Sequence, residues 1–143
     1  MKTFLSRFIN RLEPTRFFKF CLVGLSGVGV NVGVFFVLTR FFGIYDLISL
    51  ALSVEASILS NFALNEIWTF RDRARSTKGI LRRALKYHII CIGGLVICYG
   101  VYIPLTRLFH MYDLLSLLFG IAGATIWNYS MSLIWAWRYA GTR

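Results

Sequence analysis

Residues 40–50 read RFFGIYDLISL, and residues 107–117 read RLFHMYDLLSL. Each segment is a short connection between two long apolar stretches. A membrane-spanning helix needs about 20 predominantly apolar residues. Four stretches of the chain meet that requirement, at about 17–42, 47–70, 87–109 and 114–137. The sequence therefore predicts an all-α integral membrane protein in which a longer basic loop joins two helical hairpins.

The composition agrees with a membrane location. Of the 143 residues, 57% are hydrophobic and 15% are charged, whereas soluble proteins have roughly 45–50% and about 25%. These values disfavour a soluble enzyme, a disulfide scaffold and a nucleic-acid-binding protein. The sequence contains no CxxC, HExxH or Cys/His cluster, so we predict no metal site, no cofactor and no catalytic residue.

The basic residues indicate an orientation. Fourteen of the sixteen Lys and Arg residues fall in the N-terminal segment, in the central loop with its edges, or at the C-terminus. Positive charge concentrates on the cytoplasmic side of membrane proteins. We therefore expect both termini and the central loop in the cytoplasm. Arg40 and Arg107 are the two exceptions, on the outer side.

The chain matches itself when it is shifted by 67 residues. Between residues 16–71 and residues 83–138, 18 of 56 positions are identical without a gap, where about five identities are expected by chance. Each repeat contains two spans, so both repeats enter the membrane in the same direction. We predict a four-transmembrane-helix bundle built from two parallel helical-hairpin repeats, forming one domain over residues 15–143.

The N-terminal segment, residues 1–14, is expected to form a short amphipathic helix on the membrane surface. Its apolar residues recur at helical spacing and Pro14 ends the segment. They are Phe4, Leu5, Phe8, Ile9 and Leu12. The alternative is a basic terminus that is attracted to anionic lipid.

Two polar residues, Glu55 and Asn31, fall near the middle of predicted spans, where burial of a polar group in lipid costs free energy. Glu55 falls near the middle of the second span, where a carboxylate costs on the order of 3 kcal/mol by insertion scales. It has either a functional role or a protonated carboxyl bonded to a neighbouring helix or subunit. Asn31 falls in the middle of the first span, beside Gly29 and Gly33. These two glycines form a GxxxG pattern that permits close helix contact.

One face of the second span carries small polar side chains, which is typical of helix packing with interhelical hydrogen bonds. They are Ser53, Ser57, Ser60, Asn61 and Asn65. We predict packing for the three serines. For Asn61 and for Asn128, its partner in the second repeat, packing and substrate binding both stay open.

The basic residues at the cytoplasmic ends of the spans recur in register. The pairs are Arg16 with Arg83, Lys19 with Lys86, and Arg71 with Arg138. They could hold a lipid phosphate by charge-assisted hydrogen bonds, or they could only fix the orientation of the chain. Outer Arg40 and Arg107 could bind a phosphate as well. The alternative is pairing with Asp46 and Asp113, which also fit as N-caps of the second and fourth spans.

Two stretches resemble the signatures of the GtrA-like family. They are residues 16–27, RFFKFCLVGLSG, followed by Asn31, and residues 61–70, NFALNEIWTF. The resemblance covers about residues 15–140 and puts emphasis on Asn31, Asn61, Asn65, Trp68 and Phe70. The sequence departs from the family at Glu66, where a basic residue is common. If that basic residue contacts phosphate, this chain must use Arg71 or another cation.

The resemblance implies a transporter and not an enzyme. The transporter that it implies is a flippase. A flippase of this family moves a polyprenyl-phosphate-linked monosaccharide, often on undecaprenyl phosphate, from the cytoplasmic to the outer leaflet of the bacterial inner membrane. There the sugar is used for glycosylation of cell-surface polysaccharides. We expect a substrate path of Asn31, Glu55, Asn61, Asn65 and Asn128. We expect phosphate contacts from Lys19, Arg71, Arg40 and Arg107. Four spans enclose little room, so a homodimer or a higher oligomer is expected.

Two other functions stay open. The chain could be a membrane anchor that recruits a glycosyltransferase through its basic loop. It could also be a small proton-coupled exporter of cations, with Glu55 as the coupling acid.

Overall fold

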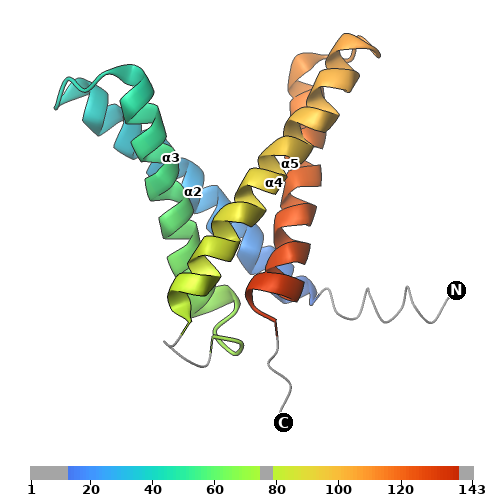
Figure 1. Cartoon of the computed structure of the whole chain (residues 1–143). Helices are drawn as coiled ribbons and strands as arrows, with labels where there is room; N and C mark the ends of the chain where they lie inside the picture. The colour runs from blue at the N-terminus through green and yellow to red at the C-terminus, as the bar shows by residue number, and fades with distance from the viewer. Residues whose placement is uncertain (1–12, 75–78, 139–143) are drawn as a thin grey trace, which may run out of the picture. The chain divides into compact units, whose positions relative to one another are not determined.

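The computed structural model of the chain describes residues 13–74 and 79–138 (Figure 1). The chain divides into two compact units, Met1–Arg75 and Ser76–Arg143. Within the described residues each unit is one helical hairpin. The surface helix predicted for residues 1–14 falls almost entirely outside the described part of the chain.

The first hairpin consists of α2 (Pro14–Arg40), α3 (Asp46–Leu64) and the π-helical turn η1 (Asn65–Thr69). Pro14 occupies the start of α2, where its missing N–H costs no hydrogen bond and its fixed φ suits the helix. Helix α2 therefore begins at the residue that was expected to end the preceding segment.

The second hairpin consists of α4 (Ile80–Arg107), α5 (Asp113–Met131) and the π-helical turn η2 (Ser132–Ala136). Every bound of α5 and η2 lies 67 residues after the corresponding bound of α3 and η1. Helix α4 begins before Tyr87, where the predicted span starts, because helix formation continues through basic residues that need no apolar surroundings.

Four helices are long and apolar enough to span a membrane. They are Pro14–Arg40, Asp46–Thr69, Ile80–Arg107 and Asp113–Ala136. The described residues contain no strand. Within each helix, only 11–22% of the most apolar 18-residue stretch is buried within the chain. Large apolar side chains such as Leu25 and Val32 are exposed. Such a surface needs lipid around it. The predicted all-α, multi-pass membrane protein is therefore confirmed.

The same kind of turn closes both hairpins. Gly43 has φ of +61° and His110, 67 residues later, has φ of +50°. This left-handed region favours Gly and tolerates His better than most other side chains. The N–H of Ile44 donates to the carbonyl of Leu38 at 3.0 Å, and Met111 repeats this bond to Leu105 at 3.0 Å.

Each hairpin has its own buried centre at corresponding positions. The buried residues include Phe20, Val23, Phe62 and Phe70 in the first hairpin and Tyr87, Ile90, Tyr129 and Trp137 in the second. An edge-to-face aromatic pair closes the basic end in both. The ring centroids are 6.3 Å apart for Phe20 and Phe70 and 5.7 Å apart for Tyr87 and Trp137.

The closest approach of the helices also recurs. A Cβ on Gly27 would overlap the side-chain amide of Asn61, and a Cβ on Gly94 would overlap that of Asn128. A Cβ on Gly29 or Gly33 would meet no atom of the described residues within 4 Å. The close contact inside the hairpin therefore uses Gly27, beneath the amide of Asn61. A close contact of Gly29 and Gly33 with another helix stays a prediction.

Candidate functional site

The basic end of the first hairpin contains a hollow of about 510 Å³. Its lining comes from the start of α2 and from η1 with the residues that follow it. The lining residues are Glu13, Thr15, Arg16, Lys19, Trp68, Thr69, Arg71 and Asp72. Two of the four predicted phosphate contacts, Lys19 and Arg71, therefore lie on one hollow although they are 52 positions apart in the sequence.

An aromatic ring holds the lysine of this hollow. The Nζ of Lys19 lies 5.6 Å from the ring centroid of Trp68, which is within the range of a cation–π interaction. The π-helical turn is the local cause of this position. Its i→i+5 hydrogen bond runs from the N–H of Phe70 to the carbonyl of Asn65 at 2.8 Å. It leaves Phe70 fully buried and Trp68 partly exposed.

Two carboxylates neutralise part of the basic end. Arg16 contacts Glu13 at 2.8 Å and Asp72 at 3.0 Å. Arg73 also approaches Glu13, at 3.6 Å. Arg16 therefore joins the start of α2 to the segment after η1. Neither carboxylate was predicted from the sequence, although the i,i+3 spacing of Glu13 and Arg16 is itself a signal of an ion pair.

The amide side chains of Asn61 and Asn128 pack against glycine backbone in the two hairpins. The Oδ1 atom of each is buried and accepts no hydrogen bond from a described residue. In the first hairpin, one turn before Asn61, the hydroxyl of Ser57 donates to the carbonyl of Gly27 at 2.8 Å. This interhelical bond is the kind predicted for the face, and it shows that the face lies between α2 and α3.

The other residues of the predicted path occupy different surroundings. Asn65 is buried at the start of η1, and Asn31 is half-buried on α2. Glu55 is exposed on α3, outside the face that packs on α2. The structure therefore brings Asn61 and Asn65 into the hairpin and leaves Glu55 on its outer surface.

Arg40 and Asp46 lie at the opposite end of the first hairpin. Both line a hollow of about 400 Å³ together with Thr39, Phe35 and Phe36. Arg40 and Arg107 each occupy the last turn of a helix, where a cation stabilises the helix dipole.

The N-cap prediction for the two aspartates is wrong. The N-cap residues are Tyr45 and Tyr112, without side-chain cap hydrogen bonds. Asp46 and Asp113 follow as the first helical residues, where a carboxylate acts on the helix dipole and not as a cap.

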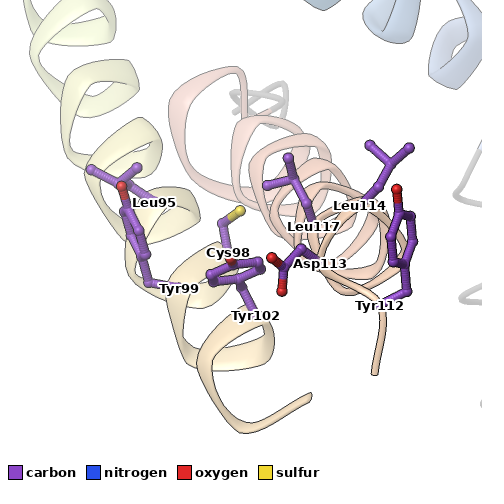
Figure 2. A pocket seen from close by; sticks show the side chains of 8 residues that line it. All are labelled: Leu95, Cys98, Tyr99, Tyr102, Tyr112, Asp113, Leu114 and Leu117. Carbon is purple, nitrogen blue, oxygen red and sulfur yellow. The ribbon is translucent and has the colours of Figure 1, made fainter. Parts of the chain in front are cut away.

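The corresponding end of the second hairpin carries a larger hollow, of about 650 Å³ (Figure 2). Its lining residues are Leu95, Cys98, Tyr99, Tyr102, Tyr112, Asp113, Leu114 and Leu117. Arg107 is exposed at the end of α4. The lining is mainly apolar and aromatic, with Asp113 as its acidic side chain.

The fold and these surfaces define a multi-pass membrane domain whose basic side chains gather at the ends of two similar hairpins. Residues 19–137 match the family described as GtrA/DPMS, transmembrane domain. The chain belongs to this family, which confirms the predicted resemblance and supports a function connected with lipid-linked sugars.

The chain is also similar to a dolichol-phosphate mannosyltransferase from Pyrococcus furiosus (strain ATCC 43587 / DSM 3638 / JCM 8422 / Vc1), with 43% identity over 90 residues. The matched region covers 63% of this chain and 25% of that protein. The chain therefore spans at most a small part of the relative that it matches.

Proposed function

We propose that the chain is a flippase for a polyprenyl-phosphate-linked monosaccharide and that it serves glycosylation of cell-surface polysaccharides. The observation that carries the proposal is the hollow at the basic end of the first hairpin. It presents Lys19 and Arg71 beside the aromatic ring of Trp68. Membership of the GtrA/DPMS family supports a lipid-linked substrate.

In this proposal the basic ends of the hairpins face the cytoplasm of a bacterium, and the chain lies in the inner membrane. Lys19 and Arg71 receive the phosphate of the substrate by charge-assisted hydrogen bonds. The polyprenyl tail stays in lipid, because the exposed apolar helix surfaces offer it no polar obstacle. Release at the outer side involves Arg40 and Arg107.

The sugar head needs hydrogen bonds while it crosses the hydrocarbon region, because an unsatisfied polar group there costs several kcal/mol. We assign this role to the polar side chains that lie at membrane depth. They are Asn31, Glu55, Asn61, Asn65 and Asn128. The buried Oδ1 atoms of Asn61 and Asn128 are acceptors that a sugar hydroxyl can reach if the helices separate. A homodimer or higher oligomer supplies further surface for the head group.

Reconstitution of the full chain in proteoliposomes tests the proposal. A panel of polyprenyl-phosphate sugars is placed in one leaflet, and access of an external sugar-modifying reagent to the other leaflet is measured over time. The chain should accelerate transfer. Joint replacement Lys19→Gln and Arg71→Gln should slow transfer by about tenfold or more, as loss of two charge-assisted bonds implies.

The matched control is Arg143→Gln, which removes a positive charge outside the described residues and should leave transfer unchanged. Glu55→Gln tests the acid in the same assay. Absence of any protein-dependent transfer for every sugar of the panel would contradict the flippase proposal.

A second candidate function is a membrane anchor for a glycosyltransferase. The observation that favours it is the similarity to part of a protein named as a mannosyltransferase. An anchor predicts that Glu55→Gln and Asn61→Ala leave glycosylation in cells intact, whereas charge removal across residues 71–83 abolishes it. A flippase predicts a loss with Asn61→Ala.

A further inference from the structure

The basic end of the second hairpin repeats the lysine and tryptophan of the first. The Nζ of Lys86 lies 5.3 Å from the ring centroid of Trp135 and donates a hydrogen bond to its backbone carbonyl at 3.0 Å. These residues lie 67 positions after Lys19 and Trp68. A lysine ammonium has three donors, and a hydrogen bond to a described residue uses one donor of Lys86.

Two further cations lie near this ammonium. Arg82 and Arg138 lie close enough to Lys86 to act on it electrostatically, and both are exposed. Like charges at this spacing repel one another, and an anion placed among them relieves the repulsion. Arginine also offers a planar set of donors that matches phosphate oxygens.

The charge balance of this end differs from that of the first hairpin. Glu13 and Asp72 neutralise arginines there, but the residues 67 positions later are Ile80 and Tyr139. Asp113, at the opposite end of the hairpin, is the one acidic residue between Ser76 and Arg143. The second unit therefore supplies no acidic side chain at this end for Lys86, Arg82 or Arg138.

We propose that Lys86, Arg138 and Arg82 form a second phosphate-binding site over Trp135, and that this site binds a phosphate group more tightly than the hollow of the first hairpin. Glu13 and Asp72 line the first hollow, and their negative charge opposes an entering anion. The inference goes beyond the proposed function, because a phosphate can bind at this site whether or not the chain transfers lipids between leaflets.

Calorimetric titration of the purified full chain in phosphatidylcholine nanodiscs tests the site. The probe is geranyl phosphate, and geraniol is the uncharged comparison. The chain carries Lys19→Gln throughout, so that the first hollow contributes little heat. Geranyl phosphate should bind and geraniol should not. Lys86→Gln and Arg138→Gln should each weaken binding by about tenfold, as expected for loss of one charge-assisted bond.

A second pair of variants keeps every cation in place. Ile80→Glu puts the acid of the first hairpin at the matching position of the second, at the start of α4, where an acid also suits the helix dipole. It should weaken binding of geranyl phosphate by about tenfold. Ile80→Gln is the neutral control and should bind like the parent chain. Equal binding by the parent and by the Lys86→Gln, Arg138→Gln double variant would overturn the proposal, as would equal binding of geraniol.

Two further titrations identify the source of the phosphate. Competition by inorganic phosphate assigns the site to a free phosphate group. Competition by phosphatidylglycerol in the nanodisc, without competition by inorganic phosphate, assigns it to a lipid head group. Both results support a phosphate site, and failure of both competitors against bound geranyl phosphate overturns it. None of these readouts depends on transfer between leaflets.

Discussion

The two hairpins share their packing and differ in their charges. The turn with a left-handed residue, the buried aromatic pair and the glycine beneath an asparagine amide recur 67 residues apart. The acids at the basic end occur in the first hairpin and have no counterpart in the second. Positions that pack one helix on another tolerate few alternatives, whereas charges at an exposed helix end can change without loss of the fold.

The largest expected loss of stability comes from the buried aromatic pairs, Phe20 with Phe70 and Tyr87 with Trp137. Phe70→Ala and Trp137→Ala should each lower the free energy of unfolding by about 3–5 kcal/mol, because both side chains are almost fully buried. Thermal unfolding of the full chain in detergent, followed by circular dichroism, measures the loss.

Phe41→Ala and Leu108→Ala are the matched controls for the aromatic pair. They replace exposed residues at corresponding positions of the two turns and should change the unfolding temperature little. A large effect in one hairpin and none in the other would break the correspondence between their cores.

The glycine contact should give the next largest effect. Gly27→Ala and Gly94→Ala force a Cβ into the amide of Asn61 or Asn128, and overpacking of this kind costs about 1–3 kcal/mol. Gly33→Ala and Gly100→Ala are the controls at corresponding positions, because nothing lies near their Cβ positions within the described residues. The controls should melt at the parent temperature or above it, since Ala favours helix over Gly.

A smaller effect is expected from the hydrogen bond that differs between the hairpins. Ser57 donates to the carbonyl of Gly27, and the corresponding residue of the second hairpin is Ala124. Ser57→Ala should lower stability by about 0.6 kcal/mol, the average for interhelical hydrogen bonds in membranes. Ala124→Ser should raise the unfolding temperature by forming the same bond to Gly94. A lower temperature for Ala124→Ser would show that the helices are spaced differently at this level.

The smallest effect should come from the ion pairs of the first hairpin. Asp72→Asn removes one partner of Arg16 and should cost about 0.5 kcal/mol or less, because solvent screens the exposed carboxylate. Unfolding temperatures at low and high salt measure the electrostatic contribution of Asp72 to stability. The difference in unfolding temperature between parent and variant should vanish at high salt. A difference that persists at high salt would show that Asp72 acts through packing.

Much of the fold follows from the sequence, because the requirements of a bilayer are simple. Long apolar stretches and the repeated YDL turn sufficed to predict four helices in two hairpins. The π-helical turns were not predicted, since an extra residue in a helical turn leaves no mark in hydropathy. The starts of α2 and α4 were also missed, because a helix can continue into water beyond its apolar stretch.

The candidate site was predictable only in part. Register along the repeat pointed to Lys19 and Arg71, and the structure places them on one hollow. Their acidic neighbours Glu13 and Asp72 were missed, because apolar spans and basic ends dominated the sequence signal. The choice of Gly27 over Gly29 as the contact glycine depends on how α2 is rotated against α3, which a sequence pattern leaves open.

The π-helical turn at Asn65–Thr69 has a consequence for changes in chain length. Its ring closes over five residues, one more than an α-helical turn requires, so the helix can lose one residue there and still keep a continuous hydrogen-bond ladder. The segment after the deletion would nearly keep its orientation about the helix axis, because the five-residue turn and the four-residue α-helical turn that replaces it cover similar angles. Arg71 would stay on the side on which Lys19 lies. Single-residue deletions within this turn should therefore yield inserted, helical proteins whose basic end is assembled on the same face.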